Sequence, residues 1–338
     1  MSTAHQGLRA PQLLEKIRAG LEATQKRLPP ECLYDDLGSA LFEAITLLPE
    51  YGLTRAGLRL FSRHAAQMAE RLSLPLDVVE LGSGSGRKTR LLLERLGVRG
   101  SVRYHPVDIS AAALAACVRE IGRLDGVEIE PLEASHLDGL HGAATARRPE
   151  AALLVLFLGS NIGNFARNEA RRFVASIRGE LRRDDTLLLA ADLVKPEAVL
   201  QAAYDDPTGV TAAFNKNALG RLNRELGANF DLREFRHQAR WNPGERRMEM
   251  HLVTQRAQRV HVAELGIQFD LAPGESVWTE SSHKFEPGEI AQLGAETGFA
   301  AVAEWTDHDW PFAQTLLVAR EPVRERTPSL PQRESTIG

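Results

Sequence analysis

The chain has few cysteines and no long apolar runs, and each shortage excludes a class of protein. Its 338 residues include only two cysteines, Cys32 and Cys117, which lie far apart in the sequence. Two isolated thiols form neither a disulfide framework nor a closely spaced metal motif, so we expect no metal site and a reducing, cytoplasmic environment. No run approaches the roughly 20 apolar residues of a membrane span, and the first residues lack the apolar core of a signal peptide. We therefore expect no membrane partner.

The chain also lacks a strong charge imbalance, which limits the partners that it can attract. Its formal net charge is −4 at pH 7, and only 6% of its residues are aromatic. It contains no basic or aromatic-rich stripe of the kind that binds nucleic acid. The composition of 43% hydrophobic and 25% charged residues is typical of a globular protein with a sizeable core. We expect a monomer that acts on a small molecule, with no nucleic acid as a partner.

The middle of the chain alternates short, continuously apolar runs with helical stretches. The apolar runs begin at Asp77, Ser101, Val127, Ala152 and Thr186. The helical stretches between them cover residues 88–96, 110–123 and 168–181. Apolar strands that alternate with helices are typical of a parallel sheet covered on both faces. This part of the sequence predicts an α/β fold with a Rossmann-like sheet.

The flanking segments follow other patterns, which predict a second, α+β domain. Helical spacing of apolar residues predicts helices over residues 13–28, 38–48 and 54–72, and later over 197–204 and 211–226. An antiparallel meander is expected from four consecutive strand-like segments, residues 235–241, 247–255, 260–265 and 276–283. A helix is then predicted over 287–297. Two last strands, over 300–306 and 312–319, are expected to complete the first sheet.

These patterns divide the chain into two domains and a tail. We predict a cofactor-binding domain from residues 57–195 and 286–320, and a substrate-binding domain from residues 10–56 and 196–285. The last segment, 321–338, is rich in Pro, Arg, Ser and Glu and is predicted to be disordered.

Three glycines follow the first apolar strand and precede a helix. Gly82, Gly84 and Gly86 form a loop that, taken alone, is also compatible with an ordinary strand-to-helix turn. Asp108 ends the second strand, where an acidic group can accept hydrogen bonds from a ribose diol. Asp108 could instead cap the next helix, although Ser110 is placed to do so. The pair of features favours an adenosine-containing cofactor, and the E-L-G-S-G segment resembles the signature of S-adenosylmethionine methyltransferases more than the GxGxxG of dehydrogenases.

The fourth strand ends in the polar segment FLGSNIGNF. Its two asparagines, Asn161 and Asn164, could be ordinary turn residues. In an open α/β sheet, however, ligands bind at the carboxyl ends of the strands. We therefore interpret both asparagines as ligand-binding residues.

Several longer segments extend this pattern to nearly the whole chain. They are LYDDLGSALFEAITLLPEY, VVELGSGSGRKTRLLL, FLGSNIGN, DLVKP, AYDDPTGVTAAFNKNALGRLNRELGANFDL, MEMHLV and TESSHKF. Together they resemble the histidine Nα-methyltransferases of the ergothioneine pathway, the EgtD family, over residues 28–320. The resemblance implies S-adenosyl-L-methionine as cofactor and Nα-methylation of L-histidine to the trimethylated betaine hercynine.

The resemblance also implies roles for single residues on the cofactor side. Gly82, Lys88 and Asp108 match positions that hold S-adenosylmethionine, and we expect the neighbouring Gly84 to join them. Lys88 by itself would more often be a solvated surface lysine.

On the substrate side, the resemblance implies a pocket for an amino acid with an imidazole ring. Asn164 and Tyr204 match residues that bind the substrate carboxylate and backbone. Glu280 and Ser282 match the pair that hydrogen-bonds the ring, and Met250 matches a residue that lines the ring pocket. Without the resemblance, Glu280 and Ser282 would be placed on a solvated strand face, and Tyr204 would be a packing residue. A ligand without an N–H would leave Glu280 buried and unpaired, which explains selection for imidazole.

Tyr34 matches a tyrosine near the reacting amine, which makes it the candidate catalytic residue. Methyl transfer from a sulfonium is an in-line displacement, so the enzyme mainly supplies proximity and alignment. The amine must also lose a proton, which a tyrosine hydroxyl or a water can relay.

Two positions depart from the family pattern. Gly52 stands where the histidine enzymes typically carry a second tyrosine against the substrate ring. Either Tyr51 or another residue replaces that contact, or the pocket accepts a different substrate or binds histidine more weakly. Ser135 and His136 stand where the family tends to have Gly-Asp-Phe, whose aspartate meets the adenine amino group. A serine or histidine can still bond the adenine edge, and we expect both residues to bind the cofactor.

Other functions compete with this hypothesis. A related methyltransferase acting on tryptophan or on a modified histidine is favoured by Gly52 and disfavoured by Glu280. A cofactor-binding module without catalysis would fit Ser135 and His136 but not Asp108. A nicotinamide-dependent oxidoreductase is disfavoured by the missing GxGxxG spacing.

Overall fold

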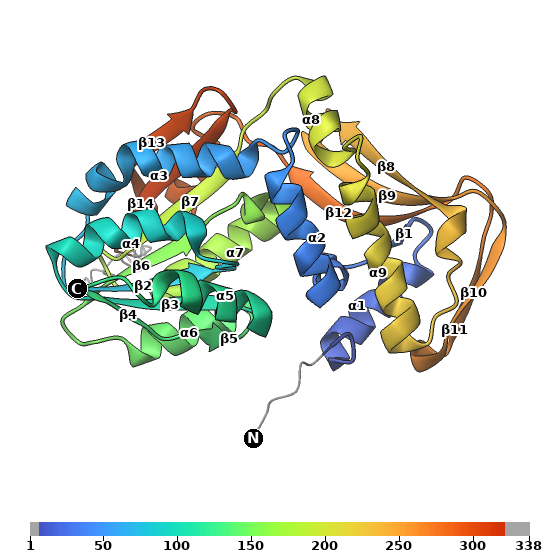
Figure 1. The fold of residues 1–338 in the computed structure, drawn as a ribbon, viewed down its shortest axis with the longest axis horizontal. Coiled ribbons are helices and arrows are strands. Elements are labelled where there is room, and N and C mark those ends of the chain that lie inside the picture. Colours follow the sequence, from blue (N-terminus) through green and yellow to red (C-terminus); the bar gives the residue numbers. More distant parts are fainter. Residues whose placement is uncertain (1–6, 322–338) are drawn as a thin grey trace, which may run out of the picture.

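The structure, a computed structural model that describes residues 7–321, is organised around two sheets that lie side by side (Figure 1). The strands of the larger sheet are β2 (Leu76–Leu81), β3 (Val102–Asp108), β4 (Val127–Ile129), β5 (Leu132–Glu133), β6 (Ala152–Phe157), β7 (Thr186–Asp192), β13 (Phe299–Asp307) and β14 (Phe312–Ala319). Their order is β13-β14-β7-β6-β2-β3-β4, with β5 beside β3. The strands from β7 to β4 run parallel, whereas β14 is antiparallel to β7 and β13 to β14.

The connections change direction between β2 and β6. The chain moves from β2 to β3 and β4 on one side, and then returns to place β6 and β7 on the other. Ligands of such open α/β sheets bind at this switch point, outside the carboxyl ends of the strands. The predicted Rossmann-like α/β fold is confirmed.

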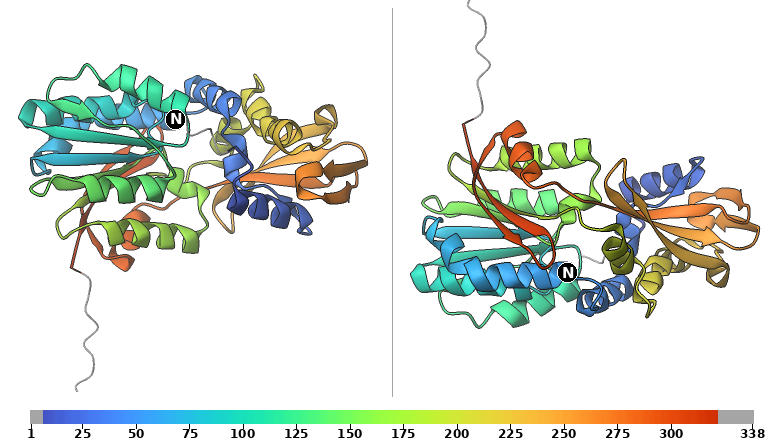
Figure 2. Two further views of the ribbon diagram at one scale, coloured as in Figure 1. Left: turned by 90° about the horizontal axis from the view of Figure 1, so that it is seen from below. Right: turned by 90° about the horizontal axis from the view of Figure 1, so that it is seen from above.

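The central strands of this sheet, β2, β6 and β7, are apolar on both faces because helices cover both. Helices α3 (Leu53–Glu70), α4 (Arg87–Arg99) and α5 (Ala111–Ile121) pack on one face, and α6 (His136–Ala146), α7 (Arg167–Glu180) and α10 (Glu289–Glu296) on the other (Figure 2). In β2, Val78 contributes to the first core and Val79 to the second. This two-sided burial explains the continuously apolar runs in the sequence.

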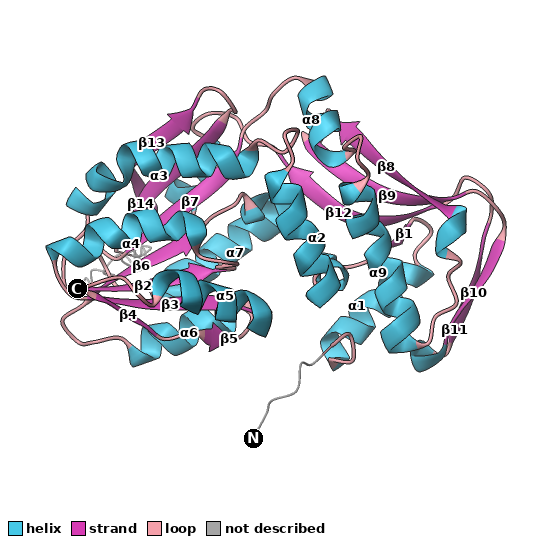
Figure 3. Ribbon diagram, in the orientation of Figure 1, coloured by secondary structure: helices cyan, strands magenta, loops and turns pink. Residues whose placement is uncertain are grey.

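The smaller sheet has the strand order β1-β12-β9-β8 and lies beside helices from the N-terminal part and the middle of the chain (Figure 3). Its strands are β1 (Lys26–Arg27), β8 (Phe235–Asn242), β9 (Arg247–Thr254) and β12 (Ser276–His283). The accompanying helices are α1 (Pro11–Glu22), α2 (Asp36–Leu47), α8 (Glu197–Tyr204) and α9 (Val210–Leu226).

Two details of this part differ from the sequence prediction. The four strands do not form a simple meander, because β10 (Gln258–Val262) and β11 (Ile267–Leu271) pair with each other as a separate hairpin and β12 returns to β9. The first helix does not reach residue 28, because Lys26 and Arg27 pair in parallel with Val277 and Trp278. The exposed edge of β12 offers these residues backbone hydrogen bonds that a further helical turn would exclude.

One apolar cluster joins the two parts of the structure. It runs from Leu92 and Leu96 beneath the larger sheet, through Tyr51 and Leu53, to Phe214 and Met250 against the smaller sheet. Between the sheets, the short helix η2 (Asn161–Asn164) follows β6 and contacts β12, where His283 Nδ1 lies 3.0 Å from the Gly163 carbonyl oxygen. The carboxyl edge of the larger sheet therefore faces the smaller one.

Two further expectations concern the ends and the helices of the chain. Residues 322–338 of the predicted disordered tail lie outside the described residues. Within residues 7–321, no helix combines the length and the apolar character needed to cross a bilayer.

Candidate active site

The glycine loop after β2 adopts a backbone conformation that other residues rarely reach. Gly82, Gly84 and Gly86 have φ angles of 75°, 52° and 71°. These left-handed values cost a residue with a side chain about 1 kcal/mol or more each. A Cβ atom on Gly86 would also lie 2.7 Å from Cys117 Sγ. The loop can therefore bring its backbone close to a ligand at the N-terminus of α4.

Asp108 lies opposite this loop, at the end of β3. Its Oδ2 accepts a hydrogen bond from the Gly84 N–H at 3.1 Å, and its Oδ1 accepts one from the Ser110 N–H at 3.0 Å. Ser110 is the cap of α5, since its hydroxyl oxygen accepts from the Ala113 N–H at 3.2 Å. Each Asp108 oxygen retains acceptor capacity, because a carboxylate offers about four lone-pair sites. The half-buried carboxylate can therefore accept hydrogen bonds from the hydroxyls of a ribose.

Lys88 projects from the first turn of α4 toward the loop after β6. A Cβ atom on Gly159 would lie 3.6 Å from Lys88 Nζ. Burial lowers the pKa of Lys88, while Glu80 and Glu43 oppose that shift. Within residues 7–321, the Lys88 ammonium makes no hydrogen bond or ion pair. A half-buried ammonium without an anion suits the carboxylate of an incoming ligand.

Glu80, the acidic residue of the E-L-G-S-G segment, is buried beneath the loop. Its two carboxylate oxygens accept hydrogen bonds from the hydroxyls of Thr89 and Tyr104. Burial raises the pKa of Glu80 to about 7, against the opposing effects of those hydroxyls and Lys88. Glu80 therefore ties β2 to α4 and β3 and supports the loop from below.

Ser135 and His136 begin α6, next to the glycine loop. The Ser135 hydroxyl donates to Asp138 Oδ2 at 2.6 Å and accepts from the Asp138 N–H, so it caps the helix. The His136 ring packs edge-on against Phe157, and its Nε2 would lie 3.2 Å from a Cβ atom on Gly82. Capping accounts for Ser135, whereas the imidazole of His136 is the group adjacent to the glycine loop.

A cavity lies between the two sheets, where the space free of protein atoms is about 510 Å³ and includes open solvent. Four segments of the chain supply its walls: the N-terminal helices, the loop after β6, helices α8 and α9, and strands β9 and β12. The lining residues are Tyr34, Phe42, Ile45, Tyr51, Leu53, Gly159, Ser160, Asn161, Asn164, Ala203, Tyr204, Thr211, Phe214, Met250, Glu280 and Ser282. All seven residues predicted to contact the substrate or the reacting amine are among them. Asn161 connects this cavity to the glycine loop, since its Nδ2 would lie 3.2 Å from a Cβ atom on Gly82.

Glu280 is a buried acidic group in this cavity. Its Oε1 accepts a hydrogen bond from the Tyr34 hydroxyl at 3.3 Å. Burial raises the pKa of Glu280 to about 7, while the Tyr34 hydrogen bond and the charge of Lys284 oppose the shift. Burial and the nearby Glu280 also raise the pKa of Tyr34 well above its ordinary value. Burying the ionised Glu280 carboxylate therefore costs free energy of folding. A buried hydrogen-bond acceptor of this kind, in a cavity, is typical of a ligand-recognition group.

Ser282, two residues further along β12, belongs to a buried polar network. The Tyr204 hydroxyl donates to Ser282 Oγ at 2.7 Å. The Lys284 ammonium donates to Tyr204 Oη and to Ser282 Oγ, each at 2.8 Å, and pairs with Asp192 Oδ2 at 2.9 Å. Asp192 also pairs with Lys195 at 2.6 Å. Two buried lysines therefore share one aspartate directly behind the cavity wall.

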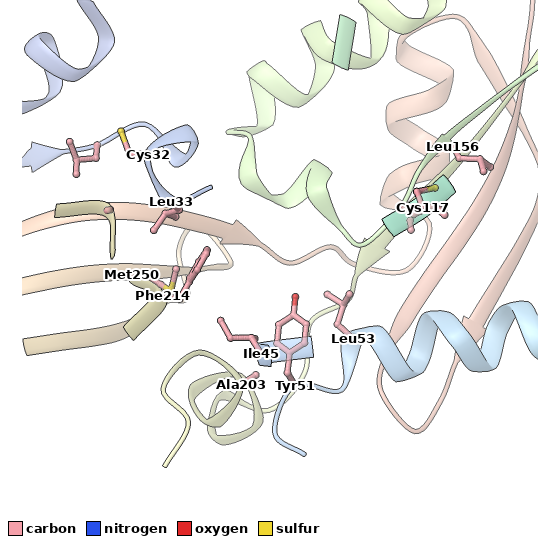
Figure 4. Packing of buried hydrophobic residues seen from close by; sticks show 14 of the residues in the cluster. Cys32, Leu33, Ile45, Tyr51, Leu53, Cys117, Leu156, Ala203, Phe214 and Met250 are labelled. Carbon is pink, nitrogen blue, oxygen red and sulfur yellow. The ribbon is translucent and has the colours of Figure 1, made fainter. Parts of the chain in front are cut away.

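Aromatic side chains form the wall between Glu280 and the N-terminal helices. The ring centroids of Tyr34 and Phe42 are 5.9 Å apart, those of Tyr34 and Phe214 5.5 Å, and those of Phe42 and Tyr51 6.3 Å. Figure 4 shows Tyr51 between Ile45, Leu53 and Ala203, with Phe214 and Met250 nearer the smaller sheet. Such a wall suits a cationic nitrogen, because ring faces attract positive charge.

Gly52 has no room for a side chain because Trp310 occupies that space. A Cβ atom on Gly52 would lie 2.1 Å from Trp310 Cε3. The indole is held in place by donating from Nε1 to Asp192 Oδ1 at 2.9 Å and by Lys195, whose Nζ lies 4.8 Å from the ring centroid. Of the adjacent pair Tyr51 and Gly52, Tyr51 therefore lines the cavity, and Trp310 fills the volume beside Gly52.

We expect Gly52→Ala to destabilise the protein by about 1–3 kcal/mol through overpacking. The backbone of Gly52 has φ −73° and ψ −15°, which any residue adopts, so the whole effect comes from Trp310. Urea unfolding of the single and double variants measures it. In a Trp310→Ala background, Gly52→Ala should be neutral or slightly stabilising. An equal cost in both backgrounds would contradict the steric explanation.

Several residues of this site were absent from the sequence prediction. Lys284 donates to the predicted Tyr204 and Ser282 and pairs with Asp192, while Phe214 and Thr211 are among the residues that line the cavity. Lys284 had a detectable signal, because it follows Glu280 and Ser282 at the two-residue spacing of one strand face. The contact of Lys284 with Asp192 joins residues 92 positions apart, and no pattern in the sequence indicates it.

Comparison with known proteins gives a consistent set of relatives. The family model described as histidine-specific methyltransferase, SAM-dependent, matches residues 13–319. The chain is 42% identical over 306 residues to the histidine N-alpha-methyltransferase of Mycobacterium tuberculosis, covering 90% of this chain and 94% of that protein. It is 40% identical to the histidine N-alpha-methyltransferase of Mycolicibacterium smegmatis, covering 91% and 95%. A more distant relative, 26% identical and covering 87% and 91%, is the 4-dimethylallyltryptophan N-methyltransferase of Claviceps purpurea.

Proposed function

Because the chain belongs to the family of histidine-specific, S-adenosylmethionine-dependent methyltransferases, we propose that it methylates the α-amino nitrogen of L-histidine. The observation that carries this proposal is the cavity that joins the glycine loop, through Asn161, to the buried Glu280 and Ser282. The two histidine N-alpha-methyltransferases that are 40–42% identical to the chain support the same substrate and position. Trimethylation to hercynine, as in ergothioneine biosynthesis, is the expected end point, since the aromatic wall suits a quaternary ammonium product.

The residues around the glycine loop fit S-adenosylmethionine. Asp108 has acceptor capacity for the ribose hydroxyls, and Lys88 has a free ammonium for the carboxylate of the methionine part. Gly82 and Gly84 allow close backbone approach, and His136 lies where an adenine edge can meet it. We assign Ser135 an indirect role, through the position of α6. When bound, the cofactor supplies an electrophilic methyl group on a sulfonium.

In the proposed complex, the histidine ring lies at β12 and its backbone lies toward the loop after β6. Glu280 accepts the ring N–H, Ser282 contacts the other ring nitrogen, and Met250 packs against the ring. Asn164 and Tyr204 hold the carboxylate and backbone, and the α-amino group faces the glycine loop. Residues 57–195 and 286–320 would then form the cofactor domain, and residues 10–56 and 196–285 the substrate domain.

Tyr34 is proposed to relay a proton rather than to act as a free base. Its raised pKa keeps the hydroxyl protonated at neutral pH. The hydroxyl oxygen can take a proton from the amine while its own proton passes to Glu280 Oε1, which lies 3.3 Å away. The pKa of Glu280, raised to about 7 by burial, suits this acceptor role near neutral pH. Alignment of amine and methyl group supplies the rest of the rate enhancement.

We expect Asp108→Ala to weaken S-adenosylmethionine binding by roughly 10- to 100-fold, because it removes charge-assisted hydrogen bonds to the ribose. Calorimetric titration with the cofactor measures the change. Ser110→Ala is the matched control, because it removes the α5 cap and should cost about 1 kcal/mol of stability without changing cofactor affinity. Unchanged affinity in Asp108→Ala would reject the ribose contact.

The proposed reaction is tested by mass spectrometry after incubation with S-adenosylmethionine and the twenty amino acids. Trimethylated histidine as the main product supports the proposal. Methylation of tryptophan instead would favour the substrate class of the Claviceps relative, whose name specifies a tryptophan derivative. A protein that binds the cofactor but methylates no amino acid would overturn the assignment of free histidine.

A further inference from the structure

Glu43 is an acidic side chain on α2 that lies at the glycine loop of the larger sheet. A Cβ atom on Gly84 would lie 3.9 Å from Glu43 Oε1. Within residues 7–321, the Glu43 carboxylate makes no hydrogen bond or ion pair, and only its backbone carbonyl accepts, from Thr46 Oγ1 at 2.7 Å. The side chain is exposed, so a ligand that lies over the loop can reach it.

Glu43 also lies near Lys88, the residue that we assign to the carboxylate of the cofactor. Burial lowers the pKa of Lys88, and the charges of Glu80 and Glu43 oppose that shift. Glu80 is buried beneath the loop, where its two oxygens accept hydrogen bonds from Thr89 and Tyr104. Of these two carboxylates, Glu43 is therefore the one that is accessible and has no partner.

The methionine part of S-adenosylmethionine carries an ammonium on the same carbon atom as its carboxylate. An acceptor for the ammonium must therefore lie close to Lys88 if Lys88 binds the carboxylate. An ammonium has three hydrogens to donate, and removing it from water without an acceptor is costly. A carboxylate is the strongest acceptor that a side chain can offer it, because the hydrogen bond is charge-assisted at both ends. Glu43 fits this requirement.

We propose that Glu43 binds the ammonium of the cofactor's methionine part and thereby ties α2 to the glycine loop. This inference rests on the proposed cofactor site. In the resulting complex, Lys88 and Glu43 hold the two charged groups of the methionine part from opposite sides. Lys88 belongs to α4 on the larger sheet, whereas Glu43 comes from a helix that lies between the two sheets (Figure 1).

Helix α2 is also part of the wall of the histidine cavity. Its start is fixed to α9, because Asn217 Nδ2 donates to Asp35 Oδ1 at 2.6 Å. Only two of its 12 residues are buried, so the rest of the helix is weakly held. Phe42 and Ile45, which flank Glu43 in the sequence, line the cavity. A contact between Glu43 and the cofactor therefore also fixes two residues that face the substrate.

The test compares S-adenosylhomocysteine with its deamino analogue, in which a hydrogen atom replaces the ammonium. Calorimetric Kd values are measured for both ligands with the wild type and with Glu43→Gln, which keeps the shape of the side chain and removes its charge. The wild type should prefer S-adenosylhomocysteine by at least about 10-fold, and Glu43→Gln should reduce this ratio to within about 3-fold. An unchanged ratio overturns the inference, including the case in which both ligands lose affinity equally, because Glu43 would then act on the adenosine part.

Asp36→Asn is the matched control, because it removes the same charge from the first turn of the same helix. Asp36 is exposed and makes no hydrogen bond or ion pair within residues 7–321. It should retain the wild-type ratio, and an equal fall in this variant would overturn the inference by showing a long-range effect of charge. A wild type that binds neither S-adenosylmethionine nor S-adenosylhomocysteine would instead overturn the proposed cofactor site.

The tie between α2 and the loop predicts a second effect, on the affinity for histidine. Histidine Kd values are measured by calorimetry with and without saturating S-adenosylhomocysteine. The wild type should bind histidine at least about 3-fold more tightly when the cofactor product is present, and this factor should approach one in Glu43→Gln. Equal factors in the two proteins would overturn the role of Glu43 in fixing α2.

Discussion

Replacing Glu280 with glutamine should make the protein more stable while it loses at least about 10-fold in kcat/KM for histidine. The functional loss is expected because, in the proposed complex, a charge-assisted hydrogen bond from the ring N–H to Glu280 becomes a neutral one. The gain in stability follows from the burial that raises the pKa of Glu280 to about 7, against an ordinary 4.5. A shift of this size corresponds to roughly 3 kcal/mol of unfolding free energy.

The sign of the pH dependence distinguishes this explanation from general repacking. Between pH 4.5 and 7, folded Glu280 holds a proton that the unfolded chain has released. Wild-type stability therefore falls as pH rises through this window because of Glu280, and the loss is complete above pH 7. The advantage of Glu280→Gln should be absent near pH 4, grow between pH 4.5 and 7, and stay constant above. Urea unfolding at a series of pH values measures it.

Glu249→Gln is the matched control on the neighbouring strand β9. Burial alone would raise the pKa of Glu249, but hydrogen bonds from Asn242, Arg247 and His251 hold it below its ordinary value. The same substitution should therefore lower stability at neutral pH and leave histidine kinetics unchanged. Equal stability of wild type and Glu280→Gln at pH 8 would contradict a strained, ionised carboxylate in the cavity.

Asp192→Asn should destabilise the folded protein by about 3–5 kcal/mol, the usual cost of leaving buried charges without a partner. The carboxylate lies within 2.9 Å of Lys284 Nζ and 2.6 Å of Lys195 Nζ, and all three side chains are at most 2% exposed. Asparagine keeps the shape and the acceptor oxygen for Trp310 but removes the negative charge. Urea unfolding at pH 7 measures the loss.

The double variant Asp192→Asn, Lys195→Met tests whether charge is the cause. It restores the net charge of the cluster to the wild-type value of one excess positive charge, which follows from two lysines and one aspartate. The combined loss should be smaller than the sum of the two single losses, as expected for groups in direct contact. Strict additivity would indicate that the Asp192 effect comes from packing.

Much of the cofactor side could be predicted from the sequence because its determinants are local. A strand, a glycine turn and a helix follow one another within residues 76–99, and the left-handed φ angles of Gly82 and Gly84 require glycine. Two-sided burial makes strands such as β2 continuously apolar, and this pattern survives in the sequence. The same locality made Ser110 recognisable as the cap of α5.

The substrate side depended on the resemblance, and its roles remain predictions, because its determinants are distant in the sequence. Nothing local shows that Tyr34 lies 3.3 Å from Glu280, 246 positions away. The β1–β12 pairing was also missed, since a two-residue edge strand has no periodicity. The local sequence pattern predicted that the first helix continues through these two residues. In the structure, backbone pairing with β12 ends the helix before them.

The sequence by itself determined the α/β sheet, the glycine loop and, through its long motifs, membership of the histidine-specific methyltransferases. These features depend on the spacing of apolar residues, on local backbone conformation and on the sequence of short motifs. All three are properties of contiguous segments of the chain. Only the tertiary structure decided that Trp310 fills the space beside Gly52, and that Lys284 and Asp192 stand behind Ser282. Packing volume and buried charge balance are set by side chains from different elements, so they exist only after the chain has folded.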